Sequence, residues 1–174
     1  MELRKFIATT IREYLNENRF TTSYGVEYSS LEDWAYDYAK EHADGFNNYE
    51  EAKEYLDWFF KLIKTLPNPM FLYRILQVDS KRLINKKSLG KHFTDNKDNF
   101  DENFLSSIGF SIGDIEEQKF YIVTIQVNLS EIDFENTIAT RLAHSYEDEY
   151  TLKTNANYKI VEIEQFLPND RINF

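Results

Sequence analysis

Residues 147–164 read EDEYTLKTNANYKIVEIE, and this stretch defines how the C-terminal part of the chain folds. It predicts a strand at Glu149–Leu152, a short turn, and a second strand at Tyr158–Glu164. Side chains along a strand alternate between its two faces, so Glu147 and Glu149 share one face. A solvated acidic turn is the simplest interpretation of such a pair. The alternative is a site in which a cation, a metal or a reaction offsets the repulsion between the two carboxylates.

Three further strands are expected upstream. Phe120–Val127 is a continuous run of apolar, β-branched and aromatic residues, which is a strong strand signal. Met70–Leu76 is a second apolar run, and it contains one charge, Arg74. An unpaired buried charge is costly, so Arg74 either reaches solvent by its long stem or binds an anion such as a phosphate or a carboxylate. The third strand, His92–Thr94, is short and follows Gly90, which indicates a turn or a close approach of the backbone.

The N-terminal third is predicted to be helical. Apolar residues recur at helical spacing in three segments, residues 3–15, 31–39 and 49–63. Ser29 with Glu32, and Asn48 with Glu51, match N-cap patterns before the second and third helices. Two prolines then end the third helix. Residues 19–29 read as a loop, and a short helix or turn is expected near residues 99–108 and 133–139.

The composition is that of a folded, acidic protein. Apolar residues make up 42% of the 174 residues, which is enough to build a core. The net charge of −10 argues against nucleic acid or an anionic membrane as a partner of the whole surface. The absence of cysteine excludes disulfides, thiolate metal sites and a cysteine nucleophile. With no apolar run of transmembrane length, we expect a soluble, cytoplasmic protein.

One segment of this acidic chain is basic. No acidic residue occurs from Ser80 to Thr94, and the segment contains five cationic side chains: Lys81, Arg82, Lys86, Lys87 and Lys91. Such a segment is either a solvated loop or a surface that attracts an anionic ligand.

The order of these pieces resembles the mono-ADP-ribosyltransferases of the Arg–Ser–Glu type. The resemblance rests on an arginine in one strand, a hydroxyl in a second strand after glycine, and a late Glu-x-Glu, and it covers residues 70–166. It implies an α+β fold in which N-terminal helices, residues 1–69, pack on a split, mainly antiparallel β-sheet core, residues 70–174, within one compact domain. The opening segment Phe6–Leu15 also resembles the openings of some phage-encoded proteins, which would place the protein in the host cytoplasm.

The resemblance implies roles for individual residues. Arg74 takes the place of the arginine that contacts the phosphate of NAD and orients the nicotinamide ribose. Glu149 takes the place of the catalytic glutamate. Glu147 takes the place of the upstream residue, which tends to be glutamate in members that modify arginine, and it is expected as a second catalytic residue that deprotonates or orients the incoming nucleophile.

The second strand departs from the family pattern. It reads His92-Phe93-Thr94 where the family has Ser-Thr-Ser. Thr94 takes the place of the first hydroxyl, since threonine supplies the same group as serine. We include His92 and Phe93 with Thr94 and Arg74 as expected cofactor-binding residues.

The implied chemistry cleaves the bond between nicotinamide and ribose in NAD, which serves as co-substrate. This cleavage passes through an oxocarbenium-like state that a carboxylate can stabilise. The implied acceptor is a protein side chain such as arginine. Nucleic-acid bases and free small molecules remain open as acceptors, and no metal or membrane is expected. Two other functions stay open. One is a catalytically inactive domain of the same fold that binds a protein, and the other is a structural phage component.

Overall fold

The computed structural model describes residues 19–100, 105, 118–144 and 148–167. The chain divides into two compact units. The helical unit consists of Met1–Asn68 with Asp133–Asp148, and the sheet unit consists of Pro69–Ile132 with Glu149–Phe174. Residues 133–148, which the predicted division placed with the 70–174 core, therefore belong with the helices. The first predicted helix, residues 3–15, lies outside the described residues.

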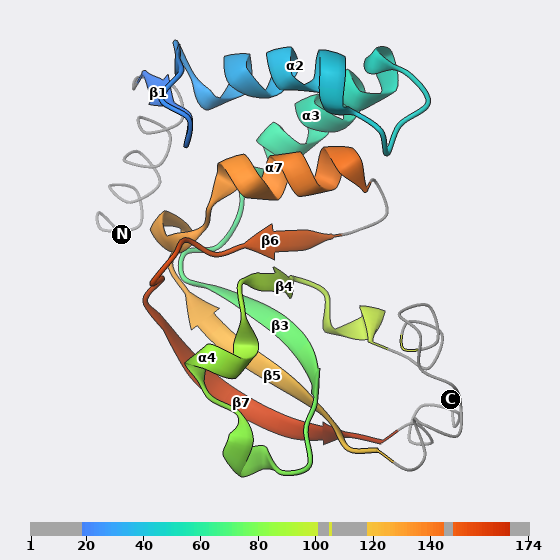
Figure 1. The fold of residues 1–174 in the computed structure, drawn as a ribbon, viewed down its shortest axis with the longest axis vertical. Helices are drawn as coiled ribbons and strands as arrows, with labels where there is room; N and C mark the ends of the chain where they lie inside the picture. The colour runs from blue at the N-terminus through green and yellow to red at the C-terminus, as the bar shows by residue number, and fades with distance from the viewer. Residues whose placement is uncertain (1–18, 101–104, 106–117, 145–147, 168–174) are drawn as a thin grey trace. The chain divides into compact units, whose positions relative to one another are not determined.

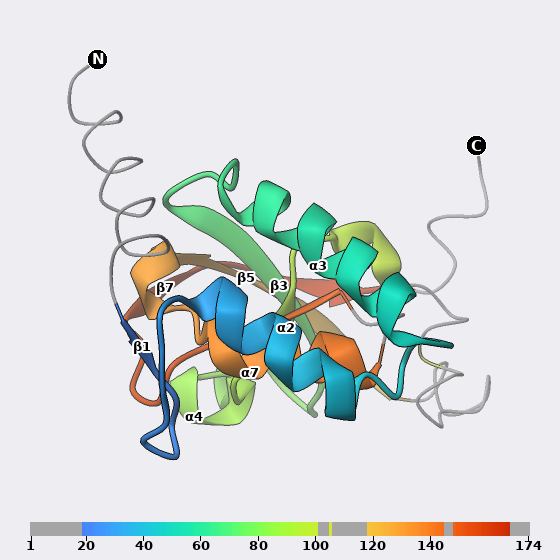
Figure 2. The ribbon, with the colours of Figure 1, turned by 90° about the horizontal axis from the view of Figure 1, so that it is seen from above.

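The helical unit is built on three packed helices. They are α2 (Leu31–His42), α3 (Tyr49–Ile63) and α7 (Phe134–Ala143). Helix α2 packs against both α3 and α7, as Figures 1 and 2 show. The second and third predicted helices are thereby confirmed, and the segment expected near 133–139 is a helix that continues to Ala143.

Side chains cap the helices at their N-termini. Helix α2 starts at Ser30, whose hydroxyl accepts a hydrogen bond of 3.0 Å from the backbone N–H of Asp33. The predicted cap at Ser29 is wrong by one residue, because the Ser29 hydroxyl bonds to the Asp33 carboxylate instead. The predicted cap at Asn48 is confirmed, and its side chain accepts from Glu51 N–H at 3.0 Å.

A small hairpin replaces part of the expected loop at residues 19–29. Its strands are β1 (Phe20–Thr21) and β2 (Glu27–Tyr28), which pair antiparallel. Gly25 lies in the turn at a φ of +83°, a conformation that glycine adopts without steric cost. Strands of two residues are too short to produce a periodic pattern, so sequence alone could not reveal them.

The sheet unit contains a five-stranded antiparallel sheet with the order β6-β4-β3-β5-β7 (Figure 1). The strands are β3 (Met70–Gln77), β4 (His92–Thr94), β5 (Phe120–Val127), β6 (Glu149–Thr151) and β7 (Tyr158–Phe166). Every expected strand is present, and the α+β class with a mainly antiparallel sheet is confirmed. Between β3 and β4 lies a short helix, α4 (Lys86–Leu89), which an Asn85 capping box starts.

The strands differ in how far they pair. Strand β3 pairs with β5 along its whole length, from Met70 opposite Val127 to Gln77 opposite Phe120. Strands β3 and β4 share one residue pair, Tyr73 opposite Thr94. Apart from this pair, β3 and β4 are not bonded to each other as strands. Few backbone hydrogen bonds therefore join β3 to β4 in the sheet.

Apolar packing supports the sheet. Strand β5 is buried along most of its length. A cluster of buried residues packs on the sheet, namely Phe100, Leu105, Phe120, Ile122 and Phe166. The helix expected near 99–108 falls largely outside the described residues. In the described part of the chain, no helix combines the length and the apolarity needed to cross a membrane.

Candidate functional site

The three strands that carry the predicted site residues are neighbours in the sheet. Strand β4 lies between β6 and β3, so Thr94 is opposite Glu149 on one side and opposite Tyr73 on the other. Arg74 follows Tyr73 in β3. Segments separated by tens of residues in the sequence thus become neighbours, and His92 contacts Arg74 through its backbone and Glu149 through its side chain.

Arg74 is held by backbone rather than by a carboxylate. Its Nη1 donates a hydrogen bond of 2.6 Å to the carbonyl oxygen of His92. This contact crosses between β3 and β4 just beyond their single residue pair. Its Nε is buried and has no hydrogen-bond partner among the described residues. A guanidinium has five N–H donors in a fixed fork, so Arg74 keeps donors that an anionic ligand could use.

Gly90 forms the surface on which this guanidinium rests. A Cβ atom built on Gly90 would lie 3.6–3.7 Å from Nη1, Cζ and Nη2 of Arg74, which is ordinary van der Waals contact. Gly90 has a φ of +65° and a ψ of −149°, a combination that residues with a side chain rarely adopt. The sequence pattern of glycine before a short strand thus corresponds to a close approach of the backbone to Arg74.

Charges around Arg74 partly offset the cost of its burial. Burial lowers the pKa of Arg74, while the negative charge of Glu149 and the nearby Tyr158 act in the opposite direction. Burial also raises the pKa of Tyr158, and the positive charge of Arg74 opposes that shift. Arg74, Glu149 and Tyr158 therefore act electrostatically on a common region, and Tyr158 is a neighbour that the sequence analysis did not include.

His92 connects β4 to the glutamate. Its Nδ1 lies 3.3 Å from Oε2 of Glu149, which is an ion pair when the imidazole is protonated. The same nitrogen lies 3.4 Å from the hydroxyl of Thr151. The imidazole is thus placed to hold the Glu149 carboxylate in one orientation. Both side chains remain partly open to solvent, with 47% of the His92 and 37% of the Glu149 side chain exposed.

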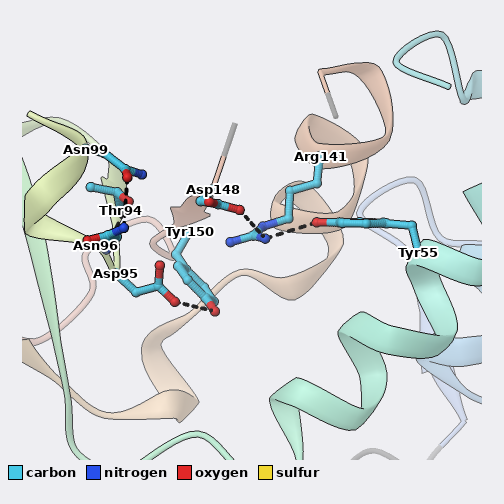
Figure 3. Close-up of polar contacts among 8 residues, drawn as sticks. All are labelled: Tyr55, Thr94, Asp95, Asn96, Asn99, Arg141, Asp148 and Tyr150. Carbon is cyan, nitrogen blue, oxygen red and sulfur yellow. Dashed lines mark hydrogen bonds and ion pairs between the residues drawn. The ribbon is translucent and has the colours of Figure 1, made fainter. Parts of the chain in front are cut away.

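Thr94 and Phe93 are buried, whereas the His92 side chain is partly exposed. The Thr94 hydroxyl accepts a hydrogen bond of 3.2 Å from the backbone N–H of Asn96, and the residue is 9% exposed (Figure 3). Phe93 is 1% exposed, and its ring meets the Tyr158 ring edge-on at 6.1 Å between centroids. Thr94 is thus the direct cross-strand neighbour of Glu149, the His92 side chain contacts the Glu149 carboxylate, and Phe93 points into the core.

Glu147, the second predicted catalytic carboxylate, lies outside the described residues. Asp148 is described and belongs to the helical unit. Its carboxylate lies 3.5 Å from Nη1 of Arg141, and the same Nη1 donates to the Tyr55 hydroxyl at 3.0 Å (Figure 3). Arg141 is 1% exposed and stacks on the Phe59 ring at 4.7 Å.

Sequence reasoning missed Arg141 and a second buried contact. Arg141 lies four residues after the fully buried Thr137, so the helical spacing could have indicated that it faces the core. In the sheet unit, the hydroxyl of the fully buried Tyr150 donates to Asp95 at 3.2 Å (Figure 3). Tyr150 follows Glu149 directly, so this bond fixes the strand that presents the glutamate.

Among the described residues, no group of three or more His, Asp or Glu side chains is arranged to hold a metal ion. Comparison of the chain with protein-family models, with curated proteins and with solved structures finds no match. We therefore infer function from the geometry of the site.

Proposed function

We propose that the protein is an NAD-dependent mono-ADP-ribosyltransferase. The observation that carries this proposal is the connected set of contacts across three adjacent strands, from Arg74 in β3 through His92 in β4 to Glu149 in β6. A cation able to bind phosphate and a carboxylate able to stabilise positive charge are the two groups that the reaction requires. The single residue pair between β3 and β4 is an observation that supports the proposal of a split sheet of the ADP-ribosyltransferase type.

The chemistry assigns different roles to the two charged groups. The bond between nicotinamide and C1′ of the ribose breaks, and neutral nicotinamide leaves with the bonding electron pair. Positive charge then develops at C1′, and the Glu149 carboxylate stabilises it. The acceptor nucleophile forms the new bond at C1′ and gives up its proton to a base, a role that the family resemblance gives to Glu147.

Arg74 binds the diphosphate of NAD in this proposal. Its buried Nε has no hydrogen-bond partner among the described residues, so a phosphate oxygen that reaches it would satisfy a donor that now has no acceptor. His92 contacts the Glu149 carboxylate, and we assign it no contact with the substrate. It therefore acts as a positioning residue for Glu149.

A second candidate function is a catalytically inactive domain that binds a protein partner. The low exposure of Thr94 favours it, since this residue is 9% exposed and its hydroxyl already accepts a hydrogen bond from the backbone N–H of Asn96. The two candidates differ in a measurable property, because an inactive domain releases no nicotinamide from NAD. For the active enzyme we propose a protein side chain such as arginine as the acceptor and the cytoplasm as the location, in the host cell if the chain is phage-encoded.

Nicotinamide release from NAD tests the proposal directly. The Glu149→Gln variant keeps the shape of the side chain but removes its charge, and we expect a loss of about 100-fold or more in turnover. Glu162→Gln is the matched control, because Glu162 is an exposed glutamate on the same face of the sheet as Glu149. The two residues belong to one row of cross-strand pairs that runs through Thr94, Tyr73 and Thr124. Equal background rates for wild type and Glu149→Gln, with a cell extract supplied as acceptor, would overturn the enzyme assignment.

A further inference from the structure

The basic segment between Ser80 and Thr94 concentrates positive charge in the sheet unit. Within the described part of the chain, none of its five cations, Lys81, Arg82, Lys86, Lys87 and Lys91, forms an ion pair. Lysines elsewhere in this chain do find carboxylates, as Lys40 with Asp37 and Lys64 with Glu32 show. With 30 acidic against 20 basic residues in the chain, this segment is a positive region that forms no ion pair with the described carboxylates.

Neutral groups hold several of these cations in place. Lys81 donates to the carbonyl oxygen of Ile163 at 2.7 Å, and Lys91 donates to the Thr154 hydroxyl at 3.1 Å. Contacts of this kind fix the position of an ammonium group without cancelling its charge. The side chains are therefore partly ordered before any anion arrives, which lowers the entropic cost of binding one.

Lys86 is the member of the segment that is tied to the Arg74 region. Its Nζ lies 4.6 Å from the centroid of the Tyr158 ring, a cation–π contact. The Tyr158 hydroxyl donates to the carbonyl oxygen of Lys86 at 3.3 Å, so two contacts join these residues. Tyr158 also interacts electrostatically with Arg74. Geometry also links Lys86 to Arg74, since Lys86 begins helix α4 and Gly90, directly after that helix, packs against the Arg74 guanidinium. Neither cation has a carboxylate in hydrogen-bond contact among the described residues.

We propose that Lys86, held on the ring of Tyr158, forms with Arg74 a subsite for the diphosphate of a nucleotide. This inference rests on the proposed function, and it adds Lys86 as a phosphate-binding residue and Tyr158 as its positioning residue. Two separate cations suit a ligand that carries two linked phosphate groups. Arg74 presents a planar fork and Lys86 a point charge, so the two phosphates are bound in different ways.

A diphosphate fits the position better than a long polyanion does. Arg74 is half-buried and contacts the backbone of β4, so a phosphate that reaches it must enter the sheet unit rather than remain on its surface. A nucleic-acid backbone would instead contact the five cations of the segment, which are all exposed, without reaching Arg74, and the net charge of −10 would repel it.

Equilibrium binding of ADP-ribose to the full chain tests the subsite, with inorganic pyrophosphate as a competing ligand. Lys86→Gln is expected to weaken both ligands about fivefold, the effect of losing one charge-assisted contact at a partly exposed site. Lys86→Arg is expected to retain most of the affinity. Lys159→Gln is the matched control, since it removes the same charge from the exposed residue that follows Tyr158.

The same samples are assayed for nicotinamide release, so that the two proposals can fail separately. Unchanged ADP-ribose affinity in Lys86→Gln overturns the subsite, even if NAD is consumed. Binding of ADP-ribose that depends on Lys86 without any consumption of NAD supports the subsite and overturns the transferase. A Lys86→Gln defect seen with a single-stranded oligonucleotide but not with ADP-ribose overturns the subsite in favour of a polymer-binding surface.

Discussion

The backbone of Gly90 is a close neighbour of the Arg74 guanidinium. A Cβ atom built at position 90 would lie 3.6 Å from Nη1 of Arg74. The arginine is therefore supported on one side by a loop whose conformation only glycine readily adopts. Its other fixed contact is the bond to the His92 carbonyl oxygen. Arg74 is thus oriented by main-chain groups of the loop and strand that follow it.

Gly90→Ala is expected to destabilise the protein by about 1–2 kcal/mol, because Gly90 has a φ of +65°, which alanine adopts only with strain. We also expect weaker ADP-ribose binding, because Gly90 neighbours the Arg74 guanidinium. Gly25→Ala is the control, since Gly25 has a φ of +83° with no atom within 4 Å of its Cβ position. Urea denaturation should show similar losses of stability for both variants. If Gly90→Ala binds ADP-ribose as tightly as Gly25→Ala does, Arg74 does not depend on the loop.

Arg74→Lys is expected to raise the KM for NAD about tenfold, although it conserves the charge. Lysine cannot bond to the His92 carbonyl oxygen and to a phosphate with the fork geometry of a guanidinium. Arg82→Lys makes the same chemical change at an exposed position of the basic segment and should leave KM unchanged. Equal KM values for the two variants would mean that Arg74 acts as a simple point charge.

Arg141→Ala is expected to lower the free energy of unfolding by about 3 kcal/mol. The substitution removes a fully buried side chain that contacts the Phe59 ring and the Tyr55 hydroxyl. Asp148→Ala should cost less than about 1 kcal/mol, because that side chain is 54% exposed and lies 3.5 Å from Arg141. Chemical denaturation of both variants measures the difference, and equal losses would show that the ion pair, rather than packing, dominates.

Stability is expected to fall as the pH rises above about 10. Burial, followed by the hydrogen bond to Asp57, raises the pKa of Tyr36 above its ordinary value of 10.0. The folded state therefore keeps a proton that the unfolded state loses, so this contribution is complete below pH 10 and declines at higher pH.

Denaturation at pH 9 and pH 11 checks this expectation. Tyr36→Phe should be less stable than wild type at pH 9 and should lose less stability between the two pH values. Tyr24→Phe, at a residue that is 92% exposed, should behave like wild type at both. A Tyr36→Phe protein with the wild-type pH dependence would contradict the assignment to Tyr36.

Local patterns predicted the elements of this fold well. Phe120–Val127 is a strand because its buried residues form a continuous apolar run, and Tyr49–Ile63 is a helix because one stripe of it is buried. The exact cap of α2 was missed because Ser29 and Ser30 are equally capable of capping. The choice between them depends on geometry that a pattern of residue types does not contain.

Long-range relationships were less accessible. Strand β4 pairs with β6 across more than fifty residues of chain, and no local signal specifies that partner. The family resemblance nevertheless named Arg74 and Glu149, and the structure places both next to His92. The contact between Lys86 and Tyr158 could not be predicted, because a cation–π contact between residues far apart in the chain produces no sequence pattern. The burial of Arg141 was overlooked because arginine in a helix usually faces solvent.

The single residue pair between β3 and β4 has a consequence for how the sheet opens. Few backbone hydrogen bonds must break to separate the β4–β6 pair from the three strands β3, β5 and β7, whereas β3 and β5 are bonded along their length. Amide protons of β4 should therefore exchange with deuterium sooner than those of β5, by a local fluctuation that leaves the core closed. A bound nucleotide that bridges Arg74 and Glu149 would suppress this fluctuation, so its arrival could be followed as slower exchange in β4.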